Sequence, residues 1–376
     1  MNKIIVAIDS FKGSIDSAGA NAACTAGIAD VLPMCRVECV TLADGGEGTV
    51  DAVAANMPGG IFHSCPARDP LGRTRMARYY ALPDRSTAII ETADCAGLTN
   101  LSLKERDPWL ASSFGLGATI ADAVSRGYRS IIVGLGGSAT NDGGTGMLQV
   151  LGYRFIDSDS HEITWHGGQI LGRIKAIDNT HVIKGLDKVR FTALCDVSNP
   201  LLGTNGATLV YGAQKGADNK ELLDRLEAGM TNYASVIGRD IADTPGAGAA
   251  GGIGAAMLAF LGASLKPGIK TILSLAGFET VISGADLIVT GEGKIDRSTF
   301  MGKGPFGIMQ IARRHNIPVI ALAGSVADDI SADGLCDIIT VTPPDMPLAT
   351  ALDKDVAACN IRNAISSCLT GRHRHS

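Results

Sequence analysis

KIIVAI, at residues 3–8, begins with a lysine and continues as a short run of apolar, largely β-branched residues. An alanine-rich stretch at 17–32 with helical character and a second β-branched run at 37–42 follow it. Strands that are buried on both faces read as continuous apolar runs, so this alternation is typical of a parallel sheet covered by helices. The beginning of the chain therefore predicts an α/β fold.

The same alternation returns near the end of the chain, with strands expected at 286–290, 318–323 and 337–341 and helices at 305–315 and 348–369. The middle differs, because its strand patterns lie among long glycine-rich loops, at 75–80, 87–91, 130–135, 153–156 and 190–195. We expect two α/β domains with mainly parallel sheets, the second inserted into the first. Residues 1–70 plus 281–376 would form a discontinuous Rossmann-like domain and residues 71–280 the inserted domain, with the active site in the cleft between them.

The composition excludes several classes of protein. The chain has 376 residues and a formal net charge of −5 at pH 7. A nucleic-acid binder or a basic membrane clamp needs clustered Lys and Arg, which this sequence lacks. The first apolar run meets an acid at Asp9, too early for a signal peptide or a membrane helix. We expect a cytoplasmic monomer or homodimer that acts on small molecules and binds neither membrane nor nucleic acid.

Loops that follow the predicted strands carry the chemistry, because ligands of open parallel sheets bind beyond the carboxyl ends of the strands. The sequence DSFKGS follows the first strand at 9–14, and ADGGEGT follows the second at 43–49. TGEGKID follows a late strand at 290–296, with Lys303 shortly after it. Any one of these loops could be an ordinary capped turn. Several in one sheet indicate a site.

The loop after the strand at 130–135 admits two interpretations. Residues 134–139 fit the pattern G-x-G-x-x-A, and Asp157 stands about twenty residues on, as in a dinucleotide site. A dinucleotide-binding helix should begin within that motif, however, and residues 140–144 delay it and place Asp142 where pyrophosphate would lie. The motif therefore gives weak support to NAD binding.

Two further segments leave their role open. Residues 245–254 open a helix with small side chains, which permits close approach by a phosphate or by a neighbouring helix. Residues 196–201 end a strand with an acid, Asp196, that either serves the chemistry or only caps the Asn199-Pro200 turn.

The strand-end loops as a set favour phosphoryl transfer. They hold Asp, Glu, Lys, Ser, Thr and Gly but no His, and their one cysteine is Cys195. Ser-His-Asp hydrolysis, thiol chemistry and a His-dependent dehydrogenase need a near-neutral base or a thiolate. Phosphoryl transfer relies on Lys, backbone N–H groups and carboxylate-held Mg²⁺. The chain lacks a Walker-type G-x-x-x-x-G-K-[ST] motif, but a nest of backbone N–H groups can hold phosphate without one.

The sequence resembles the bacterial type I glycerate kinase family, and within it the glycerate 2-kinase subfamily. The resemblance spans essentially the whole chain and rests on ordered motifs at 7–14, 43–49, 69–73, 136–144, 196–201, 214–217, 245–254 and 290–296 with Gly302-Lys303. It implies two α/β domains, one inserted into the other. It also implies transfer of the γ-phosphoryl group of ATP to D-glycerate with Mg²⁺, giving 2-phosphoglycerate in preference to 3-phosphoglycerate. A Rossmann-type NAD-dependent oxidoreductase and a non-catalytic small-molecule binding protein are the alternatives.

Residue roles are assigned from chemistry rather than from the resemblance. We predict catalytic roles for Lys12, Asp196, Lys294 and Asp296, and Mg²⁺ binding by Asp196, Asp296 and Glu292. Substrate binding is predicted for Asp9, Ser10, Asp44, Glu47, Arg73, Lys215 and Lys303. Phosphate binding is predicted for Gly137, Ser138, Asn141, Gly143, Gly248, Gly251, Gly291 and Gly293. Asp142 is a further candidate for binding Mg²⁺ or accepting the hydroxyl proton.

Overall fold

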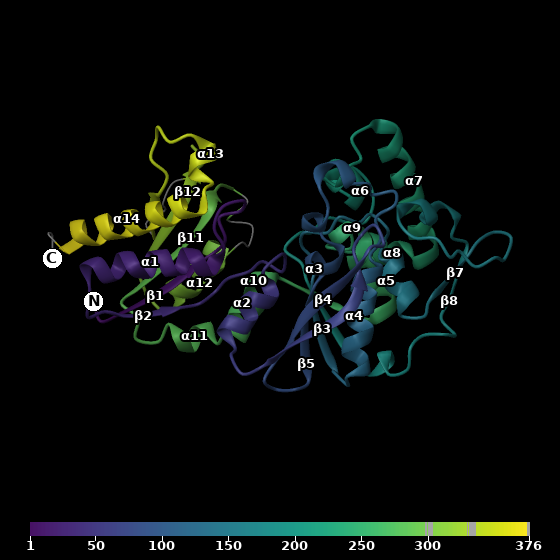
Figure 1. Ribbon diagram of the computed structural model, residues 1–376, viewed down its shortest axis with the longest axis horizontal. Coiled ribbons are helices and arrows are strands. Elements are labelled where there is room, and N and C mark those ends of the chain that lie inside the picture. Colours follow the sequence, from purple (N-terminus) through teal and green to yellow (C-terminus); the bar gives the residue numbers. More distant parts are fainter. Residues whose placement is uncertain (298, 300–303, 329, 331–335, 374–376) are drawn as a thin grey trace. The chain divides into compact units, whose positions relative to one another are not determined.

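The computed structural model describes residues 1–297, 299, 304–328, 330 and 336–373, and the chain divides into two compact units (Figure 1). Unit 1 comprises Met1–Asp44, Asp51–Asn56 and Ile269–Ser376, and unit 2 comprises Gly45–Val50 and Met57–Gly268. Unit 2 therefore interrupts unit 1 along the sequence. The long segment of unit 2 begins at Met57 and ends at Gly268, and both limits come earlier than the expected residues 70 and 280.

Two elements explain why the boundaries shift. Strand β3 (Ile61–Arg68) was not expected from the sequence, and it pairs antiparallel with β4 (Thr74–Ala81), which brings it into the sheet of unit 2. Helix α10 (Gly268–Leu275) contributes Ile269 and Leu273 to a core cluster of unit 1. Each boundary is thus set by tertiary packing that the local sequence pattern does not show.

A five-stranded parallel sheet forms the centre of unit 1. Its strand order is β13-β12-β11-β1-β2, comprising β1 Lys3–Ile8, β2 Arg36–Cys39, β11 Leu287–Ile295, β12 Val319–Val326 and β13 Cys336–Thr340. The chain passes from β1 to β2 in one direction and from β11 to β12 and β13 in the other. The strand order therefore reverses between β1 and β11, and ligands of open α/β sheets bind at such a reversal.

Helices cover both faces of this sheet. Ile4, Val6 and Ile8 of β1 pack with α1 (Ser17–Val31) and α14 (Lys354–His373) on one face. Ile5 and Ala7 pack on the opposite face, with α10, α11 (Phe278–Val281) and α12 (Gly304–Arg314). Helices α1 and α14 lie side by side (Figure 1). The short helix α13 (Leu348–Ala351) precedes α14, and α2 (Thr49–Asn56) follows β2.

The main sheet of unit 2 has the order β10-β9-β6-β5-β4-β3. Strands β5 (Thr87–Glu91), β6 (Ser130–Gly134), β9 (Arg190–Leu194) and β10 (Ser264–Lys266) are parallel, and β4 and β3 extend the sheet in antiparallel fashion. The predicted fold class, α/β with mainly parallel sheets, is confirmed.

The strand expected at 153–156 does not continue this sheet. Among the described residues, β7 (Arg154–Ile156) pairs only with β8 (Ala176–Asp178), in a separate antiparallel pair. Asp157 therefore does not end a strand next to β6, as the acid of a dinucleotide site would. The placement of Asp157 in the sequence interpretation was wrong for that reason.

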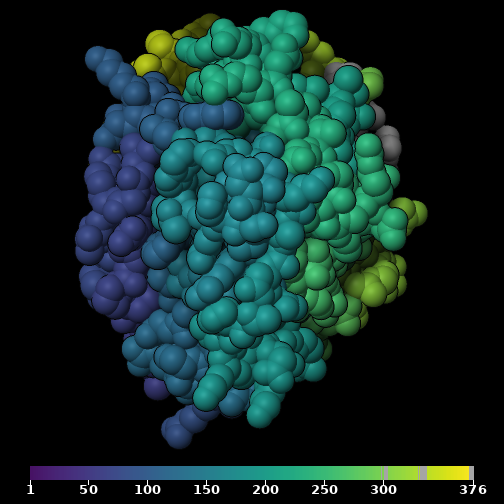
Figure 2. All heavy atoms as spheres, turned by 90° about the vertical axis from the view of Figure 1, so that its right-hand side faces the viewer, coloured from purple at the N-terminus to yellow at the C-terminus, as the bar shows by residue number. Residues whose placement is uncertain are grey.

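The helices of unit 2 are α3 (Thr92–Ala96), α4 (Phe114–Ser125), α5 (Thr145–Val150), α6 (Ala207–Tyr211), α7 (Lys220–Ile237), α8 (Arg239–Ala242) and α9 (Ala249–Leu261). They share one apolar core with the sheet, in which Tyr79, Phe155, Phe191 and Tyr233 are fully buried or nearly so. Figure 2 draws the side chains of this unit as spheres, in colours from blue to green along the sequence. No helix in the described ranges has both the length and the apolar character needed to cross a membrane.

Candidate active site

Three acids interact at the carboxyl ends of the strands of unit 1. Asp9 directly follows β1, Glu292 lies in the last part of β11, and Asp44 lies in the segment after β2. Asp9 and Glu292 are 9% and 7% exposed. Burial and then the charge of Asp44 raise the pKa of Asp9 to about 7, and Glu292 adds to this, while Lys12 and a hydrogen bond from Ser10 oppose it. The expectation that residues at the carboxyl ends of parallel strands lie close together thus identified acids that are far apart in the sequence.

The Asp9 carboxylate is held through only one of its oxygens. Oδ1 accepts a hydrogen bond from the Ser10 backbone N–H at 2.7 Å, whereas Oδ2 has no hydrogen-bond partner within the described ranges. The first residue of α12 lies beside Oδ2, because a Cβ placed on Gly304 would be 3.2 Å from it. Only a residue without a side chain leaves this space open.

The predicted lysines of unit 1 are exposed and paired with acids. Lys12 Nζ lies 3.2 Å from Asp44 Oδ2, and Lys294 Nζ lies 3.8 Å from Asp296 Oδ2. The lysine side chains are 81% and 63% exposed, so these pairs hold them weakly. The charge of Asp44 raises the pKa of Lys12, which is therefore a cation at neutral pH. Lys303 lies outside the described residues.

Thr299 links two of the three predicted metal-binding acids. Its Oγ1 donates to Glu292 Oε1 at 2.5 Å and accepts from the Asp296 backbone N–H at 3.1 Å. Thr299 thus connects Glu292, in the last part of β11, to the backbone of Asp296, directly after that strand. Carboxylate oxygens are the donors that Mg²⁺ prefers. The residues present fit a Mg²⁺ ion held by one or two protein carboxylates.

Asp196, the third predicted metal ligand, lies in unit 2 after β9. Its Oδ1 accepts a hydrogen bond from the Gly268 backbone N–H at 2.8 Å, at the start of α10. The structural role considered from the sequence was a cap on the Asn199-Pro200 turn. The observed contact instead joins the end of β9 to the residue that begins α10.

Asp142 organises the loop after β6 from its interior. Its carboxylate is fully buried and accepts four hydrogen bonds: from the Ser113 N–H and Oγ, both at 2.8 Å, and from the N–H groups of Gly144 at 3.0 Å and Gly146 at 3.2 Å. Burial raises the pKa of this carboxyl, and the hydrogen bonds oppose the rise. These four hydrogen bonds, three to Oδ2 and one to Oδ1, give Asp142 a structural role, and its candidacy for binding Mg²⁺ or accepting a proton stays a prediction.

Lys215 reaches the same loop from the 3₁₀ turn at Ala213–Lys215. It is fully buried, and its Nζ donates to Ser138 Oγ at 3.0 Å and to the Thr140 carbonyl oxygen at 2.7 Å. Burial lowers the pKa of Lys215 to about 7. Asn141 also lies in this loop and donates from Nδ2 to Thr208 Oγ1 at 3.1 Å. The structure thus brings Lys215, from the motif at 214–217, to the loop that holds Ser138 and Asn141, from the motif at 136–144.

Several predicted phosphate-binding glycines pack against neighbouring backbone. A Cβ on Gly251 would lie 2.0 Å from the Thr140 carbonyl oxygen, and one on Gly248 would lie 2.2 Å from that of Pro200. A Cβ on Gly291 would meet the Leu322 carbonyl oxygen at 2.2 Å. The remaining three differ from them: Gly137 is exposed, a Cβ on Gly143 would meet the Tyr233 ring at 2.6 Å, and Gly293 packs on Phe11. For Gly248 and Gly251, close packing is the alternative that the sequence left open.

Arg73 lies in the turn between β3 and β4. Its guanidinium pairs with Asp69 through Nε and with Glu105 through Nη1, the latter at 2.6 Å. These contacts give Arg73 a structural role, because they hold the turn between β3 and β4 in place. Glu47, by contrast, is exposed on the loop after Asp44.

Glu91 was missed in the sequence. It ends β5, is 7% exposed, and accepts hydrogen bonds from the backbone N–H groups of Gly48, at 3.3 Å, and Val50. It therefore holds the loop that contains Glu47. The signal that singled out Asp9, an acid at the carboxyl end of a predicted strand, was present at Glu91 as well.

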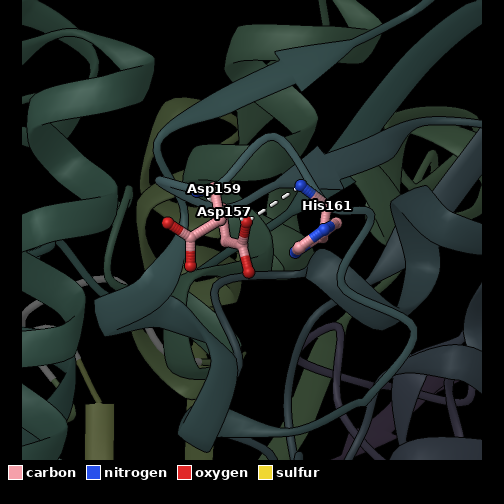
Figure 3. A group of neighbouring side chains, drawn as sticks. All are labelled: Asp157, Asp159 and His161. Carbon is pink, nitrogen blue, oxygen red and sulfur yellow. Dashed lines mark hydrogen bonds between the residues drawn. The ribbon is translucent and has the colours of Figure 1, made fainter.

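Asp157, Asp159 and His161 form a small cluster in the turn after β7 (Figure 3). Their candidate ligand atoms lie within 4.8 Å of one another. Asp157 Oδ1 accepts from the backbone N–H groups of Asp159 and His161, and Asp157 Oδ2 lies 3.4 Å from Arg173 Nη2. The turn and its ion pair with Arg173 explain the cluster without a metal.

Comparison with known proteins places this geometry in a family. Residues 4–370 match the sequence profile of the glycerate kinase family. The chain is 38% identical to a glycerate kinase of Halalkalibacterium halodurans over 94% of each chain. It is 40% identical to the glycerate 2-kinase of Escherichia coli K12 over 87% of this chain and 86% of that protein.

A solved structure agrees with these sequence relatives. A crystal structure assigned to glycerate kinase 2 of Salmonella typhimurium LT2 superimposes with a TM-score of 0.82, at 38% identity and over 99% of each chain. The sequence relatives and the structural neighbour therefore agree over nearly the whole chain. The protein belongs to the glycerate kinase family, whose members are phosphotransferases.

Proposed function

We propose that the protein transfers the γ-phosphoryl group of ATP to the 2-hydroxyl of D-glycerate. The observation that carries the proposal is the group of acids and lysines at the strand-order reversal of unit 1, where Asp9, Glu292 and Lys12 interact. A site with carboxylates, ammonium groups and no histidine suits phosphoryl transfer, which depends on positioning and on charge neutralisation. The name of the relative from Escherichia coli, glycerate 2-kinase, supports the 2-hydroxyl.

In this proposal, the charge of each residue decides whether it binds the substrates or the metal. Lys12 and Lys294 are exposed cations that can turn towards anionic oxygens of the substrates. Glu292 and Asp296 would hold Mg²⁺, which neutralises phosphate charge when it is bound. In unit 2, the loop around Ser138 offers backbone N–H groups for a further anionic group, and the buried Lys215 fixes its shape.

The test of this function is product analysis of the purified protein with ATP, Mg²⁺ and D-glycerate. We expect ADP release that depends on D-glycerate, and a phosphorus NMR signal of 2-phosphoglycerate. A signal of 3-phosphoglycerate would overturn the choice of hydroxyl. Glycerate binding without ADP release would indicate a binding protein, and glycerate-dependent change in NADH fluorescence would indicate an oxidoreductase.

Replacing either Lys12 or Lys294 by methionine should lower kcat/KM at least about tenfold. A charge-assisted contact to substrate is worth roughly 1.5–3 kcal/mol, and about 1.4 kcal/mol corresponds to a factor of ten in rate. Steady-state kinetics with each substrate varied in turn provide the measurement. Lys220→Met is the matched control, because it removes an exposed lysine that pairs with Asp224. The assignment fails if both variants match the wild type for glycerate and ATP.

Asp196→Asn distinguishes a functional from a structural carboxylate. The amide keeps an oxygen for the Gly268 N–H, so the fold should be unchanged. If Asp196 serves the metal, kcat should fall at least about tenfold at low Mg²⁺ and the Mg²⁺ concentration for half-maximal rate should rise. Titration of the rate against Mg²⁺ measures both quantities. Wild-type behaviour would leave Asp196 only its contact at the start of α10.

A further inference from the structure

Asp9 lies where the strand order of the sheet in unit 1 reverses, which is where ligands of open α/β sheets bind. It is the first residue after β1, and its backbone N–H donates to the Gly291 carbonyl oxygen of β11 at 2.8 Å. It therefore lies directly at the reversal of strand order between β1 and β11. The alternation of β1 places Ile5 and Ala7 on the α12 side of the sheet, and Asp9 continues that face next to Gly304.

The carboxylate of Asp9 is buried but has one oxygen to spare. Ser10 N–H satisfies Oδ1, and no group in the described part of the chain donates to Oδ2. Asp9 is only 9% exposed, and a buried carboxylate is costly unless a partner donates to it. Thr290 Oγ1, which is fully buried in β11 beside Ala7, is also without a partner. Within the described ranges, Oδ2 of Asp9 and the buried Oγ1 of Thr290 are thus two polar atoms on this face without a hydrogen-bond partner.

The other acids of this site already have partners. Asp44 pairs with Lys12, Asp296 lies near Lys294, and Glu292 accepts the Thr299 hydroxyl. None of them shares a hydrogen bond with Asp9 in the described ranges. Asp9 is therefore the acid of unit 1 whose free oxygen is best placed to receive a hydroxyl.

Resting on the proposed kinase function, we propose that Asp9 Oδ2 accepts the proton of the glycerate hydroxyl that becomes phosphorylated. The hydroxyl oxygen forms a bond to the γ-phosphorus of ATP while the bond from that phosphorus to the bridging oxygen breaks. ADP leaves with the electron pair of the broken bond, and the hydroxyl proton passes to Asp9. Asp9 returns the proton to water before the next turnover.

The electrostatics of the site agree with this role. A carboxyl group with a pKa near the working pH is a more effective proton acceptor than one with an ordinary pKa. Burial, the charge of Asp44 on the segment after β2 and that of Glu292 on β11 raise the pKa of Asp9 to about 7 against the opposing charge of Lys12.

The test compares Asp9→Asn and Asp9→Glu with Asp16→Asn. The asparagine variant keeps an oxygen for the Ser10 N–H but cannot take a proton, and its kcat should fall by about 10² or more, with KM for ATP changed less than about threefold. The rising limb of the wild-type pH–rate profile near pH 7 should disappear in its residual activity. The glutamate variant should recover part of the rate. Asp16, an exposed cap of α1, should behave as wild type when replaced.

Three outcomes would overturn the proposal. Asp9→Asn could keep more than about a tenth of the wild-type kcat. Its rate could return at high Mg²⁺, which would make Asp9 a metal ligand. It could lose glycerate binding in calorimetry with a non-hydrolysable ATP analogue while kcat stays normal, which would make Asp9 a binding group alone. Failure of the kinase function itself would appear separately, as absence of glycerate-dependent ADP release by the wild type.

Discussion

Asp142→Ala is expected to lower the free energy of unfolding by at least about 4 kcal/mol, since it strands four buried donors at roughly 1–3 kcal/mol each. The donors are the Ser113 N–H and hydroxyl and the N–H groups of Gly144 and Gly146. The carboxylate that satisfies them is fully buried, so water cannot replace it in the native packing. Urea denaturation, followed by circular dichroism, measures the change.

The matched controls for this prediction are Asp159→Ala and Asp142→Asn. Asp159 is exposed and its carboxylate makes no hydrogen bond within the described ranges, so its replacement should change stability by less than about 0.5 kcal/mol. Asp142→Asn keeps one acceptor oxygen but brings an NH₂ group among donors, and it should fall between wild type and Asp142→Ala. A wild-type midpoint for Asp142→Ala would show that the loop does not depend on this carboxylate.

The sequence predicts the sheets because their pattern is local. The run IIVAI at 4–8 is apolar at every position, as is typical of strands buried on both faces, and β1 pairs on both sides in the structure. Strand β3 escaped prediction because it lies at the sheet edge, leaves Ile61 and Phe62 exposed, and contains Pro66. A pattern based on burial does not identify a strand of this kind.

Looking for acids at the carboxyl ends of predicted strands identifies candidate residues, but it does not show which of them face a ligand. Asp9 and Asp142 both follow a predicted strand, yet among the described residues one carboxylate has an oxygen without a donor and the other has four donors. The difference comes from Ser113, which is 29 residues from Asp142. Likewise, Lys215 meets Ser138 across 77 residues. Such roles depend on tertiary contacts that no local pattern encodes.

These contacts divide the candidate residues into two kinds. Asp142, Lys215, Glu91 and Arg73 hold loops through hydrogen bonds that are complete or nearly so. Asp9 differs from them because the fold leaves it incompletely satisfied. A buried carboxylate with too few hydrogen bonds lowers the stability of the ligand-free protein, and such a loss of stability is common at sites that bind a ligand. The effect of Asp9 on the free energy of unfolding should therefore be measurable.

Asp9→Asn should make the ligand-free protein more stable, and the gain should grow with pH. The folded pKa of Asp9 is about 7 and its ordinary value is 3.8. Between these values the unfolded chain has released a proton that the folded chain retains, so the free energy of unfolding falls as pH rises. The penalty reaches roughly 4 kcal/mol above pH 7, at about 1.4 kcal/mol per pH unit, and the asparagine variant does not incur it.

Urea denaturation between pH 5.5 and 8, with a chelator to exclude divalent cations, tests this prediction. The stability difference between Asp9→Asn and wild type should increase by roughly 2 kcal/mol across that range, because about half of the penalty is already present at pH 5.5. Asp16→Asn should give a difference that does not change with pH, since the exposed cap is retained by the amide oxygen. If the stability difference for Asp9→Asn stays constant with pH, the charged form of Asp9 does not destabilise the fold. If the difference rises with pH, the variant is folded, and any loss of its activity is not a loss of structure.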